Sequence, residues 1–564
     1  MSSLATAAAR CHSRSSTGDV SRTSSTLVMP SPLRKHRIRL SAKVRRRPSF
    51  PLLAIDSELT PSQDANAPSS SSSSSSSPSP LSSSTLSPTV VPSIREVPGS
   101  YGAPLLGVAL DKLNYFVVQG RDEFFYSLMR RYQSTVVRVN MPPGPPFFPD
   151  SRAIMLLDHK SIRVLFDTSK VEKRDVFAGT YMPSTDFTGG FRMLPYLDPS
   201  EPKHASLKGF CFDILRSSAP RFLPEFHTAF REAADEWDAQ LLAKGEASYT
   251  AGCQNFVLCF LCRSMIEIDP SAPGPASLAE QGPSLIQAWT ALQLVPQTSL
   301  GLPTPIEVLL QTFPVPYTLV SNQYNKIYQF FFTNAQHVLD IAEQKYGLDR
   351  EEACHNLLFL ICFNTWGGMQ LLMPSIVRRI DSAGVSFQRE LARDVRSAVG
   401  EDGRLTMAAL ERMKLVKSTV YEVLRMDPPV PFQYGRAKED LIVESHDASY
   451  RIRKGELLGG YQKIAMRDPK AFQFPDTFMP RRFMGPDAER LLQNVTWSNG
   501  PETEDPTLNN KQCAGKDFVN MLARMFIAEL YLRYDFFKLG PISGSGPTAQ
   551  YKFKVLQRRR DGSS

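Results

Sequence analysis

A single cysteine near the end of the chain is placed where it could act as a ligand. Cys513 stands in the segment NKQCAGKDF, between two lysines and directly before Ala514 and Gly515. An apolar run at 518–534 follows and predicts a helix that starts close to the sulfur. A thiolate in such a place can hold a metal or a cofactor. The segment by itself also fits an ordinary buried thiol.

Two segments upstream carry paired charges. Glu422 and Arg425 in EVLR are three residues apart, so on a helix they share one face and can form an ion pair. Alone, this pair also fits an exposed surface interaction. The segment FMPRRF (478–483) adds an arginine cluster that can reach the pair. In this order and spacing, the three segments resemble the haem-thiolate cytochrome P450 superfamily, over roughly residues 95–560.

The resemblance implies a mainly α protein with a minor β part, in the cytochrome P450-like haem-thiolate fold. It also implies haem b as the cofactor, with the thiolate of Cys513 as the axial ligand of the iron. Physical chemistry agrees with this assignment. N–H groups at the start of the next helix favour a negative sulfur, and Ala514 and Gly515 let the backbone lie close to the porphyrin.

Haem also carries two propionates, which need cations. Lys511 lies two residues before the cysteine. His204 and Lys208 are four residues apart, on one face of a helix that is expected to begin near Pro202. The resemblance implies propionate or haem-edge contacts for these three side chains and for Lys173. Each of them also fits an ordinary surface charge.

Two departures from the superfamily pattern bear on the reaction. Oxygen-activating members carry an acid–Thr pair on a long central helix, which delivers protons to bound dioxygen. The corresponding segment here, HNLLFLICFNTWGGMQ (355–370), has Asn364 and a Gly-Gly pair instead. The loop before the cysteine is expanded to WSNGPETEDPTLNNKQCAG (497–515). Such a protein is expected to act on a substrate that already contains an O–O bond, without a reductase or NADPH.

Both departures resemble one plant group, the fatty acid hydroperoxide enzymes, which comprise allene oxide synthases, hydroperoxide lyases and divinyl ether synthases. The segments VEKRDVFAGTYMPSTDFTGG (171–190), YLDPSEPKH (196–204), FNTWGG (363–368) and SNGPETEDPT (498–507) carry this resemblance. It implies a fatty acid hydroperoxide as the substrate and homolysis of its O–O bond by ferric iron.

The resemblance also implies roles for two side chains. The resemblance assigns Phe177 to the position that separates the synthases from the lyases, because the lyases have Leu there. The π face of a ring beside an electron-poor carbon favours oxidation of the carbon radical and loss of a proton. Asn364 is expected to hydrogen-bond the hydroperoxide and guide proton removal. The expected activity is therefore that of an allene oxide synthase. Plainer interpretations are a core aromatic for Phe177 and a local backbone hydrogen bond for Asn364.

Three other activities stay open at this point. Phe177 disfavours a hydroperoxide lyase on the same scaffold, and the missing acid–Thr pair disfavours a reductase-dependent monooxygenase. The apolar body, with 34 Phe, disfavours a non-catalytic haem carrier or sensor. Pro195 is a further departure, because the related synthases carry Ser there, and it removes a hydroxyl near the expected pocket. Peripheral association with a membrane, through an apolar patch near the pocket mouth, also stays open.

The positive charge of the chain is concentrated at its start. The net charge is +9, yet residues 1–55 alone hold eleven Lys/Arg and one acid, Asp19. The remainder is close to neutral, which argues against a nucleic-acid-binding body. Abundant Ser, few acids and no apolar core segment predict a chloroplast transit peptide over 1–55, although a basic anion-binding tail also fits. A disordered Ser/Pro-rich linker is expected over 56–93, and a single haem-thiolate catalytic domain over 94–564.

The elements that must position these residues follow from hydrophobic periodicity. The chain has eight cysteines but no disulfide framework, and Cys259 and Cys262 predict core thiols because no second ligand pair lies nearby. The segment 357–373 predicts a buried core helix, because polar and glycine residues interrupt it. Further helices are expected at 223–245, 323–347, 386–400 and 406–426, and strands at 134–141, 152–158, 440–445 and 449–455.

Overall fold

Helices form most of the part of the chain that the computed structural model describes: residues 93–559, apart from 178, 180, 275–276, 402, 447 and 545–548. The predicted transit peptide lies outside the described residues, and so does the predicted linker except for its last residue. The predicted class, mainly α with a minor β part in a cytochrome P450-like fold, is confirmed.

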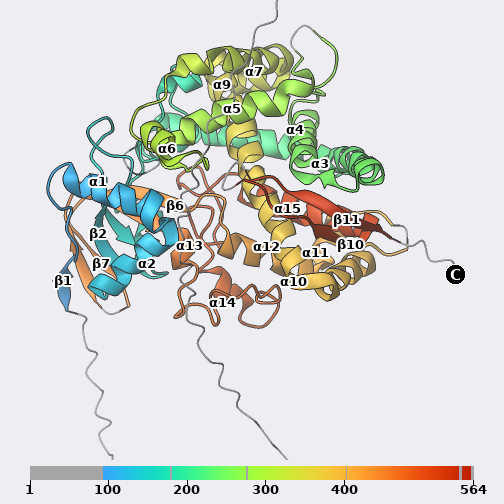
Figure 1. The fold of residues 1–564 in the computed structure, drawn as a ribbon. Helices are drawn as coiled ribbons and strands as arrows, with labels where there is room; N and C mark the ends of the chain where they lie inside the picture. The colour runs from blue at the N-terminus through green and yellow to red at the C-terminus, as the bar shows by residue number, and fades with distance from the viewer. Residues whose placement is uncertain are drawn as a thin grey trace, which may run out of the picture. The chain divides into compact units, whose positions relative to one another are not determined.

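The α-helices of the described residues differ widely in length, and several short 3₁₀ or π segments join them (Figure 1). Their bounds are α1 (Leu106–Leu113), α2 (Arg121–Tyr132), α3 (Pro202–Lys244), α4 (Tyr249–Met265), α5 (Gly282–Leu294), α6 (Thr304–Leu310), α7 (Ser321–Asn334), α8 (Gln336–Tyr346), α9 (Arg350–Leu358), α10 (Gly367–Val399), α11 (Met407–Arg412), α12 (Lys414–Met426), α13 (Gln462–Ala465), α14 (Ala488–Leu492) and α15 (Lys516–Arg533).

The largest sheet of the described residues has the strand order β2-β3-β9-β6-β4. Strands β2 and β3 pair antiparallel, β3 runs parallel to β9, and β6 is antiparallel to both β9 and β4. In Figure 1 the blue helices α1 and α2 lie beside this sheet. The strand bounds are β2 (Val136–Asn140), β3 (Arg152–Leu156), β4 (Val171–Glu172), β6 (Phe432–Ala437) and β9 (Leu457–Tyr461).

Two smaller sheets complete the β part of the described residues. One has the order β1-β8-β7. Its strands β7 and β8 correspond to the strands predicted at 440–445 and 449–455, and they pair antiparallel. The other has the order β10-β11-β5. The bounds are β1 (Ile94–Glu96), β7 (Leu441–Glu444), β8 (Ser449–Ile452), β5 (Ala247–Ser248), β10 (Tyr534–Leu539) and β11 (Lys552–Arg558).

A long helical segment, Arg350–Val399, runs through the core and carries the residues expected beside the iron. It consists of α9, the π-helix η8 (Phe359–Trp366) and α10. By length and composition alone this segment could cross a membrane, but 61% of its apolar window is buried inside the protein. That burial agrees with the expected core helix. A π turn widens the helix locally and is often found at functional sites.

Some helix boundaries differ from the sequence expectation. The predicted helix 223–245 is the second half of the 43-residue α3 (Pro202–Lys244), which is capped by Gly245 in the left-handed region (φ 67°). The predicted helix 406–426 breaks at Met413 into α11 and α12. The carboxylate of Asp394, on α10, accepts the backbone N–H groups of Leu415 and Val416, so a cap from another element starts α12. The predicted helix 323–347 also breaks, at Ala335, and 386–400 is the end of α10.

Candidate active site

Cys513 lies at the end of the expanded loop, two residues before Gly515, which is the N-cap residue of α15. The backbone N–H of Cys513 donates to the carbonyl of Ser498 at 2.8 Å. The side-chain amide of Gln512 donates to the carbonyl of Pro501, also at 2.8 Å. These bonds join the two ends of the loop, so the expansion does not leave the cysteine loosely held.

The side chain of Cys513 is accessible and its thiol is perturbed by its surroundings. Its side chain is the one exposed cysteine among the described residues, yet burial raises the pKa of its thiol. The N–H of Gly515 acts against burial and lowers this pKa, as expected at a helix start. The neighbouring thiol of Cys211 is buried and its pKa is raised by burial to about 12, so Cys513 is the thiol that can serve as a ligand.

Three of the four predicted cationic residues are buried, Lys511 is half-buried, and all four lie close enough to influence one another. Burial, and then the positive charge of Lys511, lower the pKa of Lys173 to about 7. Burial lowers the pKa of Lys511 to about 7 and that of Lys208 to about 8. Burial and both of these lysines lower the pKa of His204 to about 4. The structure thus brings together all four, with Asp198 as the carboxylate that acts on three of them.

This cluster has the positive charge and the unused hydrogen-bonding groups of an anion site. Lys173 and Lys208 donate to neutral side chains and a carbonyl, Asn499 Oδ1 (3.3 Å) and Asn510 O (2.6 Å). The buried Nδ1 of His204 has no hydrogen-bond partner among the described residues. Buried cations are costly unless a counter-charge joins them. The residues present therefore fit a ligand that carries two carboxylates, as haem does, beside a thiolate.

One residue of this cluster was missed by the sequence argument. Asn499 accepts from Lys173 and donates from Nδ2 to the carbonyl of Lys511 at 3.0 Å. It adopts the left-handed backbone conformation (φ 65°), which Asn tolerates better than most residues. The Asn-Gly dipeptide at 499–500 is a turn signal that could have located it.

Lys511 is held by a loop that also contains Pro195. Its ammonium group donates to the carbonyls of Leu194, Pro195 and Leu197 at 3.2, 3.0 and 2.7 Å. The Pro195 ring replaces a hydroxyl, but the loop contributes backbone oxygens to the site. The departure from the family pattern at this position therefore leaves the position of Lys511 intact.

Asn364 lies within the π-helix η8 and its side chain is exposed although the helix crosses the core. The side chain has no hydrogen-bond partner among the described residues, so the local backbone bond considered for it is not formed. A Cβ placed on Gly368 would meet no atom within 4 Å. The amide of Asn364 thus faces open space with its donors and acceptor available.

Phe177 belongs to an aromatic cluster that borders Asn364. Its ring centroid lies 5.9 Å from that of Phe363 and 5.5 Å from that of Tyr196. Phe363 in turn stacks on Phe359 at 4.5 Å. The side chain of Phe177 is only partly buried, so one part of the ring is available to a ligand. Segments far apart in the chain thus bring the two predicted catalytic residues to the same aromatic cluster.

The charged residues of EVLR and PRRF form one buried network. Glu422 accepts two hydrogen bonds from Arg425, at 2.8 and 2.9 Å, and one from Arg482 Nε at 3.0 Å. Glu422 and Arg425 are fully buried, and both guanidinium groups lie over the ring of Phe472. The predicted contact between the two segments is therefore made. The plainer interpretation of EVLR as an exposed pair is wrong.

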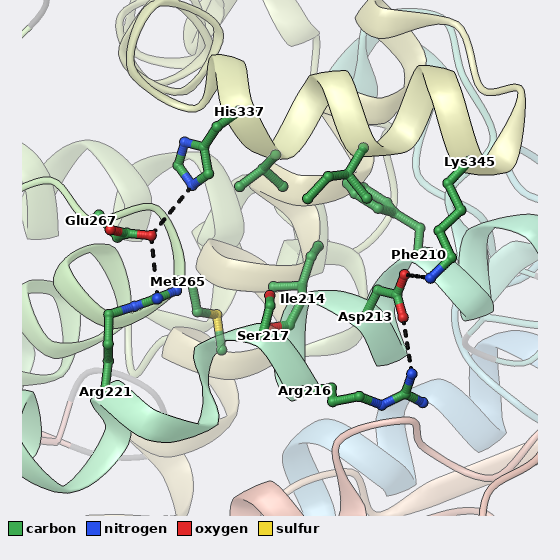
Figure 2. Close-up of a pocket in the computed structure, with 12 residues that line it drawn as sticks. Phe210, Asp213, Ile214, Arg216, Ser217, Arg221, Met265, Glu267, His337 and Lys345 are labelled. Carbon is green, nitrogen blue, oxygen red and sulfur yellow. Dashed lines mark hydrogen bonds and ion pairs between the residues drawn. The ribbon is translucent and has the colours of Figure 1, made fainter.

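A surface pocket of about 360 Å³ lies between α3, the end of α4 and α8 (Figure 2). Its charged residues pair with one another: Asp213 with Arg216 and with Lys345, and Glu267 with Arg221 and with His337. None of the predicted site residues lines it. It is a surface feature apart from the candidate active site.

Comparison with known proteins agrees with the site. Residues 386–544 match the family "Cytochrome P450". Over 448 residues the chain is 49% identical to "Allene oxide synthase, chloroplastic" of Arabidopsis thaliana, covering 79% of this chain and 86% of that protein. The chain belongs to the cytochrome P450 family, in the group of the plant allene oxide synthases.

Other relatives place the chain in the same group. It is 47% identical over 493 residues to "Allene oxide synthase 1, chloroplastic" of Solanum lycopersicum, covering 87% of this chain and 90% of that protein. It is 44% identical over 454 residues to a divinyl ether synthase of Selaginella moellendorffii, covering 79% and 92%. The predicted family is confirmed, and the relatives of this cytochrome P450 include both allene oxide synthases and a divinyl ether synthase. Membership in the family implies a haem-thiolate cofactor.

Proposed function

We propose that the protein binds haem b through the thiolate of Cys513, with the two propionates in the cluster of Lys173, His204, Lys208 and Lys511. The excess of buried cations and the unpartnered Nδ1 of His204 support this arrangement. Bound there, a ferric haem would supply homolysis of the peroxide bond and then a one-electron oxidation of the substrate.

We further propose that the reaction is the dehydration of a fatty acid hydroperoxide to an allene oxide. The substrate loses one carbon-bound hydrogen as a proton and the outer oxygen of its peroxide as hydroxide, which together leave as water. No external electron or dioxygen enters this balance, so neither a reductase nor NADPH is required. The residues of the protein bind and orient the substrate and guide the proton.

Asn364 is proposed to hold the hydroperoxide. Its side-chain amide is free of local bonds, so it can donate a hydrogen bond to one peroxide oxygen, and its carbonyl oxygen can accept a hydrogen bond that guides the departing proton to the hydroxide. Phe177 is proposed to present its ring to the electron-poor carbon and so favour its oxidation over cleavage of the carbon chain. The single observation that carries the proposal is that Phe177 packs against Phe363, the residue next to Asn364.

The finer assignment rests on several supports. The names of the relatives from Arabidopsis thaliana and Solanum lycopersicum include the words allene oxide synthase and chloroplastic. We propose a chloroplast location, the 13-hydroperoxide of linolenic acid as substrate, and a place in oxylipin and jasmonate biosynthesis. Peripheral membrane association is part of the same proposal.

Product analysis tests this assignment. The haem-loaded full chain would be given the 13-hydroperoxide of linolenic acid without any reductant, and the products identified by mass spectrometry. Ketols and cyclopentenone, formed from an allene oxide by water and by cyclisation, are the expected result. Short aldehydes with a shortened oxo-acid would instead identify a hydroperoxide lyase, and a divinyl ether would identify the activity of the relative from Selaginella moellendorffii. A requirement for NADPH would overturn the hydroperoxide mechanism.

A further inference from the structure

Arg121, the first residue of α2, has a guanidinium group without a carboxylate partner among the described residues. The group lies between two rings, 5.6 Å from the centroid of Tyr115 and 5.5 Å from that of Phe432. The guanidinium group makes a long contact of 3.5 Å with the carbonyl of Gln297 and also interacts with the hydroxyl of Tyr115. A guanidinium group has five N–H donors, so most of its donors are unused.

The acid next to Arg121 does not neutralise it. The carboxylate of Asp122 is engaged by Lys463 and by the hydroxyl of Tyr461. These two partners hold the pKa of Asp122 below its ordinary value even though burial acts in the opposite direction. The pair of Asp122 and Lys463 is balanced, so the positive charge of Arg121 is left over.

Helix α5 and the following 3₁₀ turn η6 (Val295–Gln297) connect Arg121 with the candidate active site. Trp289 packs against Phe363, the neighbour of Asn364, at 6.0 Å. About two turns further along the same helical segment, the carbonyl of Gln297 contacts the guanidinium group of Arg121. Eight residues at about 1.5 Å per residue separate the two contacts by about 12 Å. The contact of Arg121 with this helical segment thus lies about 12 Å along it from the contact made by Phe363, a spacing of the order of an alkyl chain.

A second route of contacts leads from Phe177 to the same arginine. A Cβ on Gly179, two residues after Phe177, would lie 3.9 Å from the ring of Tyr434. Tyr434 stacks on Phe432 at 5.9 Å, and Phe432 lies under the guanidinium group of Arg121. The residues that link Phe177 with Arg121 through these contacts are therefore aromatic, and aromatic side chains suit contact with a hydrocarbon chain.

We propose that Arg121 binds the carboxylate of the fatty acid substrate, with the aromatic rings of Tyr115 and Phe432 holding its guanidinium plane in position. The inference rests on the proposed function for the identity of the substrate. Arg121 is a binding residue, far from the reacting atoms, that fixes how far the chain enters and so which carbon reaches Asn364. The bidentate fork of a guanidinium group matches a carboxylate better than an ammonium group does.

Binding of a non-reactive ligand tests this inference without turnover. Calorimetry on the haem-loaded full chain would compare the 13-hydroxy analogue of the substrate with its methyl ester, which has no carboxylate charge. Arg121→Gln is expected to weaken binding of the acid by about 10- to 100-fold, the range for a charge-assisted hydrogen bond. The affinity of Arg121→Gln for the ester is expected to stay within about twofold of the wild-type value. The affinity of Arg121→Lys for the acid is expected to lie between those of the wild type and Arg121→Gln.

Arg131→Gln is the matched control, because Arg131 lies on the same helix over a tyrosine ring but is exposed. It should leave the affinities for acid and ester unchanged. Equal losses for acid and ester in Arg121→Gln would show that Arg121 only supports the aromatic cluster and would overturn the inference. An unchanged affinity of Arg121→Gln for the acid would overturn it as well. The products made from the hydroperoxide report separately on the proposed function, so either idea can fail alone.

Discussion

The ring of Phe177 lies 5.9 Å from the ring of Phe363, although the two residues belong to a loop and to the central π-helix. This contact brings the predicted product-determining side chain to the residue that precedes Asn364 in the chain. It allows the two predicted roles, positioning of the peroxide and stabilisation of an electron-poor carbon, to be tested separately.

Replacement of the ring should change the product and not the binding of haem. For Phe177→Leu we expect the fraction of ketol and cyclopentenone to fall and the fraction of short aldehydes to rise, because the π face that favours oxidation of the carbon radical is gone. Mass spectrometry of the products measures this ratio. Phe166→Leu alters a partly buried ring in another core cluster and should leave the ratio unchanged. An unaltered ratio in Phe177→Leu would remove Phe177 from the mechanism.

Loss of the Asn364 amide should slow turnover. In Asn364→Ala we expect kcat to fall by about 100-fold, as for removal of one well-placed hydrogen-bond donor. The absorption spectrum of the haem should stay the same, since Asn364 is not among the proposed haem contacts. Asn334→Ala, which removes a side-chain bond to the carbonyl of Phe330 elsewhere, should retain full turnover. Comparable turnover in both variants would contradict the assignment.

Thiolate ligation can be tested by spectroscopy. Cys513→Ser should abolish the absorption features of a thiolate-ligated haem, because a serine hydroxyl stays protonated and is a poor ligand for the iron. Cys211→Ser is the matched control, since the thiol of Cys211 is buried and its pKa is raised to about 12 by burial. Thiolate features that persist in Cys513→Ser would mean that another cysteine holds the iron.

A buried acid in the cysteine loop should make stability depend on pH. Burial raises the pKa of Glu502 to about 7, while Trp497 and Asn520 donate to its carboxyl group. The folded state therefore keeps a proton that the unfolded state releases. The resulting stabilisation is complete below the unfolded pKa of about 4.5 and is lost as the pH rises through about 7.

The matched variants Glu502→Gln and Glu504→Gln check this dependence by chemical denaturation. Between about pH 5 and about pH 8, the unfolding free energy of the wild type should fall relative to Glu502→Gln, by up to about 3 kcal/mol. Glu504 is exposed in the same loop, so the difference between the wild type and Glu504→Gln should not change with pH. A flat difference for Glu502→Gln as well would show that Glu502 is ionised throughout.

The buried charge network should be indispensable for folding. Glu422→Ala would leave Arg425 unpaired and fully buried, which costs about 3–5 kcal/mol. Glu439→Ala removes an exposed carboxylate and should change the unfolding free energy by less than about 0.5 kcal/mol. Unfolding by denaturant measures both, and similar small effects would show that the network contributes little.

The sequence by itself determined the class of the fold and the family, and it predicted the site residues. Hydrophobic periodicity located strands such as β2 and β3, because a two-residue alternation is a local property of the chain. The order of EVLR, PRRF and Cys513 identified the family, because each segment carries its own chemistry in adjacent residues.

Only the tertiary structure decided which of these residues meet, and in what state. The breaks in the helices at Ala335 and Met413 and the cap that Asp394 gives to α12 depend on contacts that no local pattern encodes. The lowered pKa of Lys173 arises from burial, and the free donors of Arg121 from the absence of a carboxylate beside it among the described residues. Such properties depend on neighbours distant in sequence, because burial and electrostatic fields are set by the whole fold.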